Sequence, residues 1–170
     1  MKLIEIKQEE FDGIFAEMEK NFIPDERRDH ADAKRVLNNP AYHVFHVVKD
    51  GEKMGFITVW CLDGVTFGEH FVIYERFRGA GVGARALALL QQKFDHIVLE
   101  VEHPETPMQA RRLAFYKRNG FLENDYPYLQ PAYRKGGREV PLILMSYPAP
   151  LEDPAAVAAH IRREVYESAN

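Results

Sequence analysis

The sequence has one cysteine, no long apolar run and no excess of positive charge, and each of these absences excludes a class of protein. Cys61 alone cannot form a disulfide within the chain, so we expect a reducing compartment and a cytoplasmic location. No stretch approaches the roughly 18 apolar residues of a membrane span, and we expect no signal peptide in the N-terminal MKLIEIKQEE. A formal net charge of -4 argues against a general binder of nucleic acid or of a membrane surface. Any anion site must therefore be local.

Metal-binding patterns are lacking as well. His43 and His46 lie three positions apart in a strand pattern, so their side chains should face opposite ways and should not share a metal. No Cys/His grouping has the spacing of a zinc site, and no serine nucleophile motif occurs. The sequence predicts a site that works without a metal.

The first part of the chain predicts a strand, two helices and an antiparallel meander. With 170 residues, of which 46% are apolar, the chain suffices for one domain, which we expect to span 1–170. KLIEI alternates as a short strand, and helical patterns follow within 9–22 and 23–39. Three strand patterns within 42–75 are then separated by DG turns.

After residue 76 the pattern changes to alternating helices and strands. A helix marked by Leu87, Leu90 and Phe94 is followed by the strand HIVLEV, a helix ending at Gly120 and two further strand patterns. This order predicts a mixed α/β sheet, because a strand that returns through a helix runs parallel to its predecessor. Asp153 and Pro154 begin a last helix over about 153–168. That helix either covers its own core or joins a second copy in a homodimer.

The stretch FRGAGVGARALALL, residues 77–90, joins a strand to a helix through three glycines. Such a turn presents converging N–H groups and the positive end of a helix dipole, which favour a phosphate. A triphosphatase loop is excluded because no lysine follows the glycines. A dinucleotide site fits the pattern of Gly79, Gly81 and Ala84 with Glu100, but too little chain follows for a doubly wound sheet. A tight turn that only packs helix on strand is the remaining alternative.

RFRGAGVG resembles the acyl-CoA pyrophosphate loop of the GNAT superfamily of N-acetyltransferases, [QR]-x-x-G-x-[GA], here at Arg76, Gly79 and Gly81. HIVLEV is similar to the family's fifth strand, and FYKRNGF to its Y-x-x-x-G-F signature. The resemblance covers about 2–148 and implies the order β-α-α-β-β-β-α-β-α-β-β, here with an extra C-terminal helix. The aromatic segment YPYLQPAYRKGGREVPLILMSYP resembles a bacterial subset of the superfamily.

The resemblance implies acetyl-CoA as co-substrate and assigns residues to it. The backbone of the fourth strand would pair with the pantetheine arm, at Phe71, Val72 and Ile73. The loop would take the pyrophosphate, with Arg76 orienting it, at Arg78, Gly79, Ala80, Gly81, Val82, Gly83 and Ala84. Gln109 stands where the family usually has an asparagine. Four further cations would either reach the phosphates or lie on the solvated surface of the helix: Arg111, Arg112, Lys117 and Arg118.

The reaction that the resemblance implies is direct attack of an amine on the thioester, with no acyl-enzyme. The ammonium must lose a proton and the thiolate must gain one, so two positioned groups are needed. Tyr116 matches the family's general acid. We expect Glu69 to be the base, with His70 second, because strand alternation places Glu69 on the face of Phe71 and Ile73.

Three functions remain open on the sequence alone. The first is an N-acetyltransferase for a primary amine of a small molecule or an amino acid. The second is a protein or peptide N-acetyltransferase, and the third a non-catalytic acyl-CoA-binding regulatory module. Acids in or near the first two helices would attract a cationic amine or lie scattered on the surface, at Glu9, Glu10, Asp25, Glu26 and Asp32. Tyrosines 126, 128 and 133, with Gln130, would line an acceptor pocket or an interface.

Overall fold

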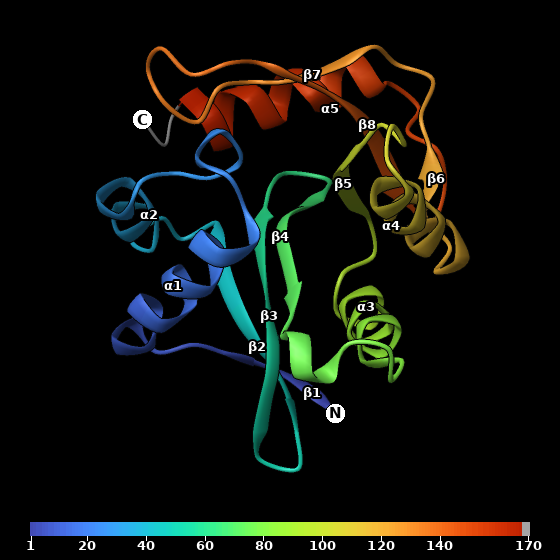
Figure 1. The fold of residues 1–170 in the computed structure, drawn as a ribbon. Helices are drawn as coiled ribbons and strands as arrows, with labels where there is room; N and C mark the ends of the chain where they lie inside the picture. The colour runs from blue at the N-terminus through green and yellow to red at the C-terminus, as the bar shows by residue number, and fades with distance from the viewer. Residues whose placement is uncertain (168–170) are drawn as a thin grey trace.

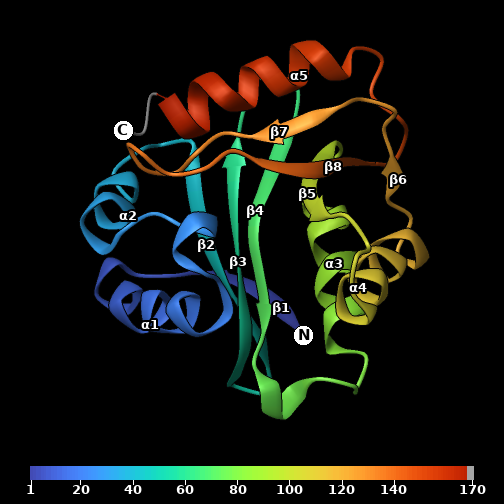
Figure 2. The same ribbon diagram turned by 45° about the horizontal axis from the view of Figure 1, so that its top comes forward.

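The computed structural model describes residues 1–167 and shows one mixed sheet with helices on both faces. Figures 1 and 2 place α1 and α2 on one side, α3 and α4 on the other, and α5 beside β7. The strand order is β1-β2-β3-β4-β5-β8-β6, and β7 also pairs with β8. The strands are β1 (Lys2–Glu5), β2 (Tyr42–Lys49), β3 (Glu52–Cys61), β4 (Thr66–Ile73), β5 (Ile97–Glu102), β6 (Leu122–Glu123), β7 (Tyr128–Gln130) and β8 (Val140–Tyr147). The α-helices are α1 (Phe11–Asn21), α2 (His30–Val36), α3 (Val82–Lys93), α4 (Pro107–Arg118) and α5 (Pro154–Ile161).

The predicted meander is confirmed, since β1 to β4 pair in sequence and antiparallel. Asp50 and Gly51 form the turn between β2 and β3 with φ of 52° and 83°, the left-handed conformation that a tight hairpin turn requires. The predicted mixed sheet is also confirmed, because β4 and β5 are parallel while β5 and β8 are antiparallel. The segment after α4 forms three strands rather than the two expected, and the short β6 and β7 both pair with β8.

Two clusters of buried side chains, one on each face of the sheet, make up the core. One cluster joins α1, α2 and α5, and the other joins α3 and α4. The last helix covers the chain's own core, because Ile161 and Val165 are both 0% exposed. It is α-helical over α5 and continues as a π-helical turn over Arg162–Glu167, and the expected end at residue 168 lies outside the described residues. None of the helices within residues 1–167 is long and apolar enough to cross a membrane.

Candidate active site

Strands β4 and β5 touch at one end and separate at the other. Their parallel ladder covers only Thr66–Gly68 against Ile97–Leu99, whereas β4 continues to Ile73. At Gly68 a Cβ atom would lie 2.6 Å from a methyl group of Leu99, so glycine permits the close contact there. The separation of the two strands therefore begins immediately after Gly68 (Figures 1 and 2).

A β-bulge lies at the point of separation. Gly68 pairs with Val59 and His70 with Thr58, so Glu69 is the extra residue of β4 opposite β3. A bulge bends its strand and increases the local twist, which turns the rest of β4 away from β5. The bulge thus helps to open the space between the two strands.

Beyond the bulge, β4 carries the residues predicted to pair with the pantetheine arm. Phe71, Val72 and Ile73 pair with β3 on one side, while their other side belongs to no ladder within the described chain. Phe71 and Ile73 pack on the face of α3 and α4, and Val72 is buried on the opposite face. Apart from Ile73 O, which accepts from Arg78, the peptide groups on this side of the stretch could bind an extended ligand.

The glycine loop ends at the N-terminus of α3. Gly79 and Gly81 have φ of 83° and 72°, and Gly81 is the N-terminal cap of the helix. The first hydrogen bond of α3 runs from Arg85 N to Gly81 O, 3.2 Å, so the N–H groups of Val82, Gly83 and Ala84 precede it. These N–H groups and the helix dipole favour an anion.

The three arginines around the loop have different partners. Arg78 donates to Ile73 O and to Asn21 Oδ1, both at 2.8 Å, and so ties the loop to β4 and α1. Arg76 forms an exposed ion pair with Glu52 at 3.2 Å rather than contacting the loop. Arg85 donates to the loop itself, at Ala80 O, 3.3 Å.

Tyr116 and Gln109 both lie on α4. Tyr116 is partly buried against the rings of Phe115 and Phe121, and burial raises its pKa to about 12. Gln109 has a structural contact that the sequence analysis missed: its Oε1 accepts from Thr106 N at 2.9 Å in a capping box. Its side-chain carbonyl oxygen therefore stabilises the start of α4. The S/T-x-x-Q pattern in the sequence was the signal that could have predicted this contact.

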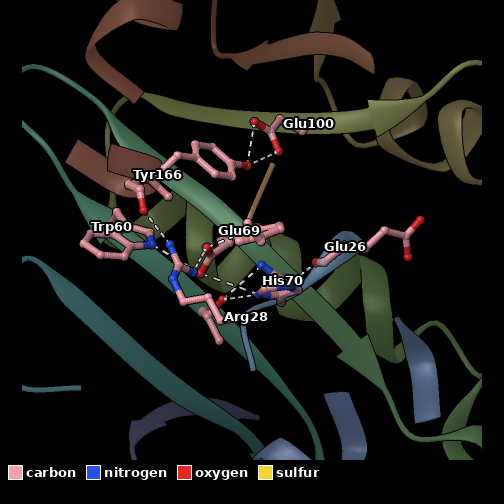
Figure 3. A network of polar contacts seen from close by, with 10 residues as sticks. Glu26, Arg28, Trp60, Glu69, His70, Glu100 and Tyr166 are labelled. Atoms are coloured by element: carbon pink, nitrogen blue, oxygen red, sulfur yellow. Dashed lines mark hydrogen bonds and ion pairs between the residues drawn. The ribbon is translucent and has the colours of Figure 1, made fainter. Parts of the chain in front are cut away.

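Glu69 lies in a buried ion pair (Figure 3). Its side chain is 0% exposed and pairs with the guanidinium of Arg28, and Trp60 Nε1 and Tyr133 Oη each donate to it at 3.2 Å. Burial alone would raise the pKa of Glu69, but the charges of Arg28 and His70 outweigh burial and hold it well below its ordinary value. A carboxylate in this state accepts a proton poorly, which does not favour Glu69 as the base.

The expected orientation of Glu69 is wrong. The contacts with Trp60 and Tyr133 place its side chain in the cluster of α1, α2 and α5, whereas Phe71 and Ile73 face α3 and α4. The bulge is the physical reason, because an inserted residue shifts the alternation of every side chain before it relative to those after it.

His70 faces the same cluster and holds the segment that precedes α2. Its Nε2 donates to Glu26 O at 3.1 Å, and its Nδ1 lies 3.3 Å from Thr58 Oγ1 (Figure 3). Since a carbonyl oxygen only accepts, the contact with Glu26 O requires a proton on Nε2. His70 therefore positions the segment around Glu26.

The aromatic segment after α4 contributes to the core. Tyr128 and Tyr133 are each 4% exposed and belong to the core, and Tyr128 also lines a surface groove. The carboxyl group of Glu100 accepts hydrogen bonds from Tyr128 and Tyr166, the latter at 2.8 and 3.0 Å (Figure 3). Burial raises the pKa of Glu100 to about 7, although both hydrogen bonds act to lower it. Tyr126 is only partly buried and lies on a surface groove with His103 and Leu129.

The sequence analysis did not predict Arg28 as a buried residue. It is 4% exposed, and besides Glu69 it contacts Val165 O at 2.5 Å. The segment around Arg28 has the composition of a charged surface, and nothing in the local sequence distinguishes Arg28 from its exposed neighbours. Within residues 1–167 no three His, Cys, Asp or Glu side chains are grouped to hold a metal ion.

The comparisons with known proteins agree with this geometry. The family model described as an acetyltransferase (GNAT) domain matches residues 40–123. A protein of Bacteroides thetaiotaomicron assigned to the GNAT family of acetyltransferases is 28% identical, with 98% of each chain covered and a TM-score of 0.92. A search of curated proteins found no match.

More distant solved structures share the fold. An aminoglycoside 6'-N-acetyltransferase complexed with coenzyme A is 18% identical, with 90% of this chain and 100% of that chain covered and a TM-score of 0.63. The ribosomal-protein-S18-alanine N-acetyltransferase of Escherichia coli is 17% identical, with 91% and 97% covered and a TM-score of 0.60. The family model and the similarity to the Bacteroides protein together show that the chain belongs to the GNAT superfamily of acetyltransferases and is an acyltransferase enzyme.

Proposed function

We propose that the protein transfers the acetyl group of acetyl-CoA directly to a primary amine of a small molecule or an amino acid. One observation carries the proposal: the glycine loop at the start of α3 adjoins the end of β4 that has separated from β5. A phosphate group at the loop and an extended arm along β4 would therefore lie next to each other. The complex of the aminoglycoside enzyme with coenzyme A supports the same choice of co-substrate.

The residues around the loop fit the phosphates of acetyl-CoA. The free N–H groups of Val82, Gly83 and Ala84 would bind the pyrophosphate, and no heavy atom lies within 4 Å of a Cβ built on Gly79, so a ligand has room to approach the backbone there. Arg78 and Arg85 hold the loop through backbone carbonyls. The peptide groups of Phe71, Val72 and Ile73 would bind the pantetheine arm.

The chemistry needs one group to protonate the leaving sulfur. Tyr116 is proposed for this role, because a phenol whose pKa is about 12 remains protonated at neutral pH and can donate to a developing thiolate. The other proton, on the acceptor ammonium, needs a carboxylate with access to the amine. The buried and ion-paired Glu69 lacks that access, and its contacts suit a positioning role.

A protein or peptide acceptor is the second candidate. It is favoured by the shared fold of the E. coli enzyme, whose name specifies the alanine of a ribosomal protein. Acceptors of both kinds therefore belong in the test.

The test is acetyl-CoA binding by calorimetry together with thiol release from acetyl-CoA in the presence of amines. The panel consists of polyamines, amino acids, aminoglycosides and short peptides with a free N-terminus or lysine. Binding with amine-dependent thiol release is expected, and the best acceptor identifies the class. Absence of acetyl-CoA binding would contradict the role of the glycine loop.

A further inference from the structure

We propose that Glu26 is the group that removes the proton from the acceptor ammonium. The assignment rests on the proposed acetyl transfer and adds the residue that the site otherwise lacks. Glu26 ends the short 3-10 turn Pro24–Glu26 that precedes α2, and its residue is only partly buried. Glu26 is therefore less buried than Glu69, whose side chain is 0% exposed.

The backbone around Glu26 is held from several directions. His70, on β4 directly after the bulge, donates to Glu26 O at 3.1 Å, and Arg134 donates to Pro24 O. The pair between Arg138 and Asp25, at 3.3 Å, is largely exposed on the side of Arg138 and adds little to this support. Within the turn, Glu26 Oε2 accepts from Ile23 N at 3.3 Å. A group that must meet a substrate repeatedly in one geometry needs such support.

The carboxyl group points away from the buried cluster. Figure 3 shows the Glu26 side chain directed away from Arg28 and Glu69, while its backbone stays on His70. The charged groups that act on it come from the elements around the opening between β4 and β5: Glu102 at the end of β5, Arg112 on α4 and His70 on β4. Glu102 and Arg112 form an ion pair with each other.

The same ion pair also acts on Tyr116. Arg112 and Glu102 are the two charges that influence its phenol, and Tyr116 lies one helical turn after Arg112. The same ion pair thus influences both groups, Glu26 on the turn before α2 and Tyr116 on α4. The transfer requires one acid and one base.

The ionisation of Glu26 suits the role. Burial raises its pKa above the ordinary value and the charge of Glu102 adds to this, against the Ile23 N–H, Arg112 and His70. A carboxylate with a raised pKa is a better proton acceptor. The negative charge also attracts a cationic amine.

The step balances as follows. The ammonium gives one proton to the Glu26 carboxylate, and the neutral nitrogen forms a bond with the thioester carbon. The carbon–sulfur bond breaks, Tyr116 gives its proton to the leaving sulfur, and the phenolate takes the second proton from nitrogen. Glu26 then releases its proton to solvent, which leaves the amide and free coenzyme A.

The test compares Glu26→Gln with Asp25→Asn, which removes the same charge from the neighbouring residue of the turn. With the best amine of the panel, Glu26→Gln should lower kcat about 100-fold at pH 7 while acetyl-CoA affinity stays within twofold. The loss should shrink as the pH approaches the pKa of the amine, because the amine then deprotonates without help. The wild-type kcat/KM should stay nearly constant at neutral pH and fall at acidic pH as Glu26 is protonated, whereas the kcat/KM of the variant should follow the fraction of unprotonated amine over the whole range. Asp25→Asn should keep kcat within threefold.

Two results would overturn the assignment. If Glu26→Gln raises only the KM for the amine and leaves kcat unchanged, Glu26 attracts the substrate but does not remove its proton. If kcat falls equally at every pH, the variant has disturbed the turn rather than the proton transfer. In both cases wild-type turnover shows that the proposed function stands. Wild-type protein that binds acetyl-CoA and acetylates no amine contradicts the proposed function and this assignment together.

Discussion

Glu69 and Glu100 lie on the neighbouring strands β4 and β5, yet their carboxyl groups have opposite pKa shifts. Desolvation acts on both, but only Glu69 is paired with a guanidinium, whereas the partners of Glu100 are neutral hydroxyl groups. Glu69 is thereby fixed as an anion, and Glu100 exchanges its proton near neutral pH. For each carboxylate the partner determines its role more than the strand position does.

At the scale of single residues, the Arg28–Glu69 pair should be essential for stability. Arg28→Met leaves a buried carboxylate without its cation, and we expect the free energy of unfolding at pH 7 to fall by about 3–5 kcal/mol. The double variant Arg28→Met/Glu69→Gln removes both charges and should recover more than about 1 kcal/mol of this loss. Urea unfolding measures the free energy of unfolding of the wild type, of Arg28→Met and of the double variant. A loss of under about 1 kcal/mol in Arg28→Met would mean that water reaches the pair.

Tyr116→Phe tests the proposed acid at the same scale. Removal of the hydroxyl should lower kcat about 100-fold and leave the acetyl-CoA affinity within twofold, because the ring still packs between Phe115 and Phe121. Tyr147→Phe is the matched control, since its ring also packs on Phe121 but carries no proposed role. Steady-state kinetics with the best amine measure kcat for both variants and the wild type. Equal activity in both variants would assign the sulfur's proton to another donor.

At the scale of elements, the order of strands and helices was predictable and the bulge was not. Helical spacing and DG turns indicate where the elements lie, because each depends on neighbours in sequence. A bulge depends on how β3 and β4 pair, which alternation in β4 alone does not show. For this reason the face of Glu69 was assigned wrongly. The burial of Arg28 has the same origin, because its partners lie at positions 69 and 165.

The glycine loop provides the prediction at this scale. Gly81→Ala places a side chain at a φ of 72°, and Gly64→Ala does the same at 80° in the turn between β3 and β4, at the other end of β4. Each should lower the free energy of unfolding by about 1 kcal/mol. Only Gly81→Ala should weaken acetyl-CoA binding, by about tenfold, because Gly81 caps α3 and directs its first N–H groups. Calorimetry and urea unfolding give the two quantities. Equal acetyl-CoA affinity in both variants would exclude the loop from binding.

At the scale of the whole molecule, the C-terminal segment is joined to both halves of the sheet. Val165 O accepts from Arg28, which holds the segment before α2, and Tyr166 donates to Glu100 on β5. Tyr133 packs on Tyr166 with ring centroids 4.9 Å apart. The start of α2, the separated strands and the last helix therefore share one polar network, and a change in Glu100 should affect the stability of the entire chain.

The pH dependence of stability tests this network. The carboxyl pKa of Glu100 is about 7 in the folded protein and 4.5 as its ordinary value, so folding takes up a proton between these two pH values. The contribution is fully present below pH 4.5 and is lost as the pH rises through 7; it amounts to about 3 kcal/mol. Glu69 acts in the opposite sense, but only as the pH falls below its ordinary value, outside this window. Urea unfolding of the wild type and of Glu100→Gln between pH 5 and 8 isolates the effect, since other titrating groups are common to both proteins. The stability of Glu100→Gln relative to the wild type should rise with pH across this range, and a constant difference would show that Glu100 keeps an ordinary pKa.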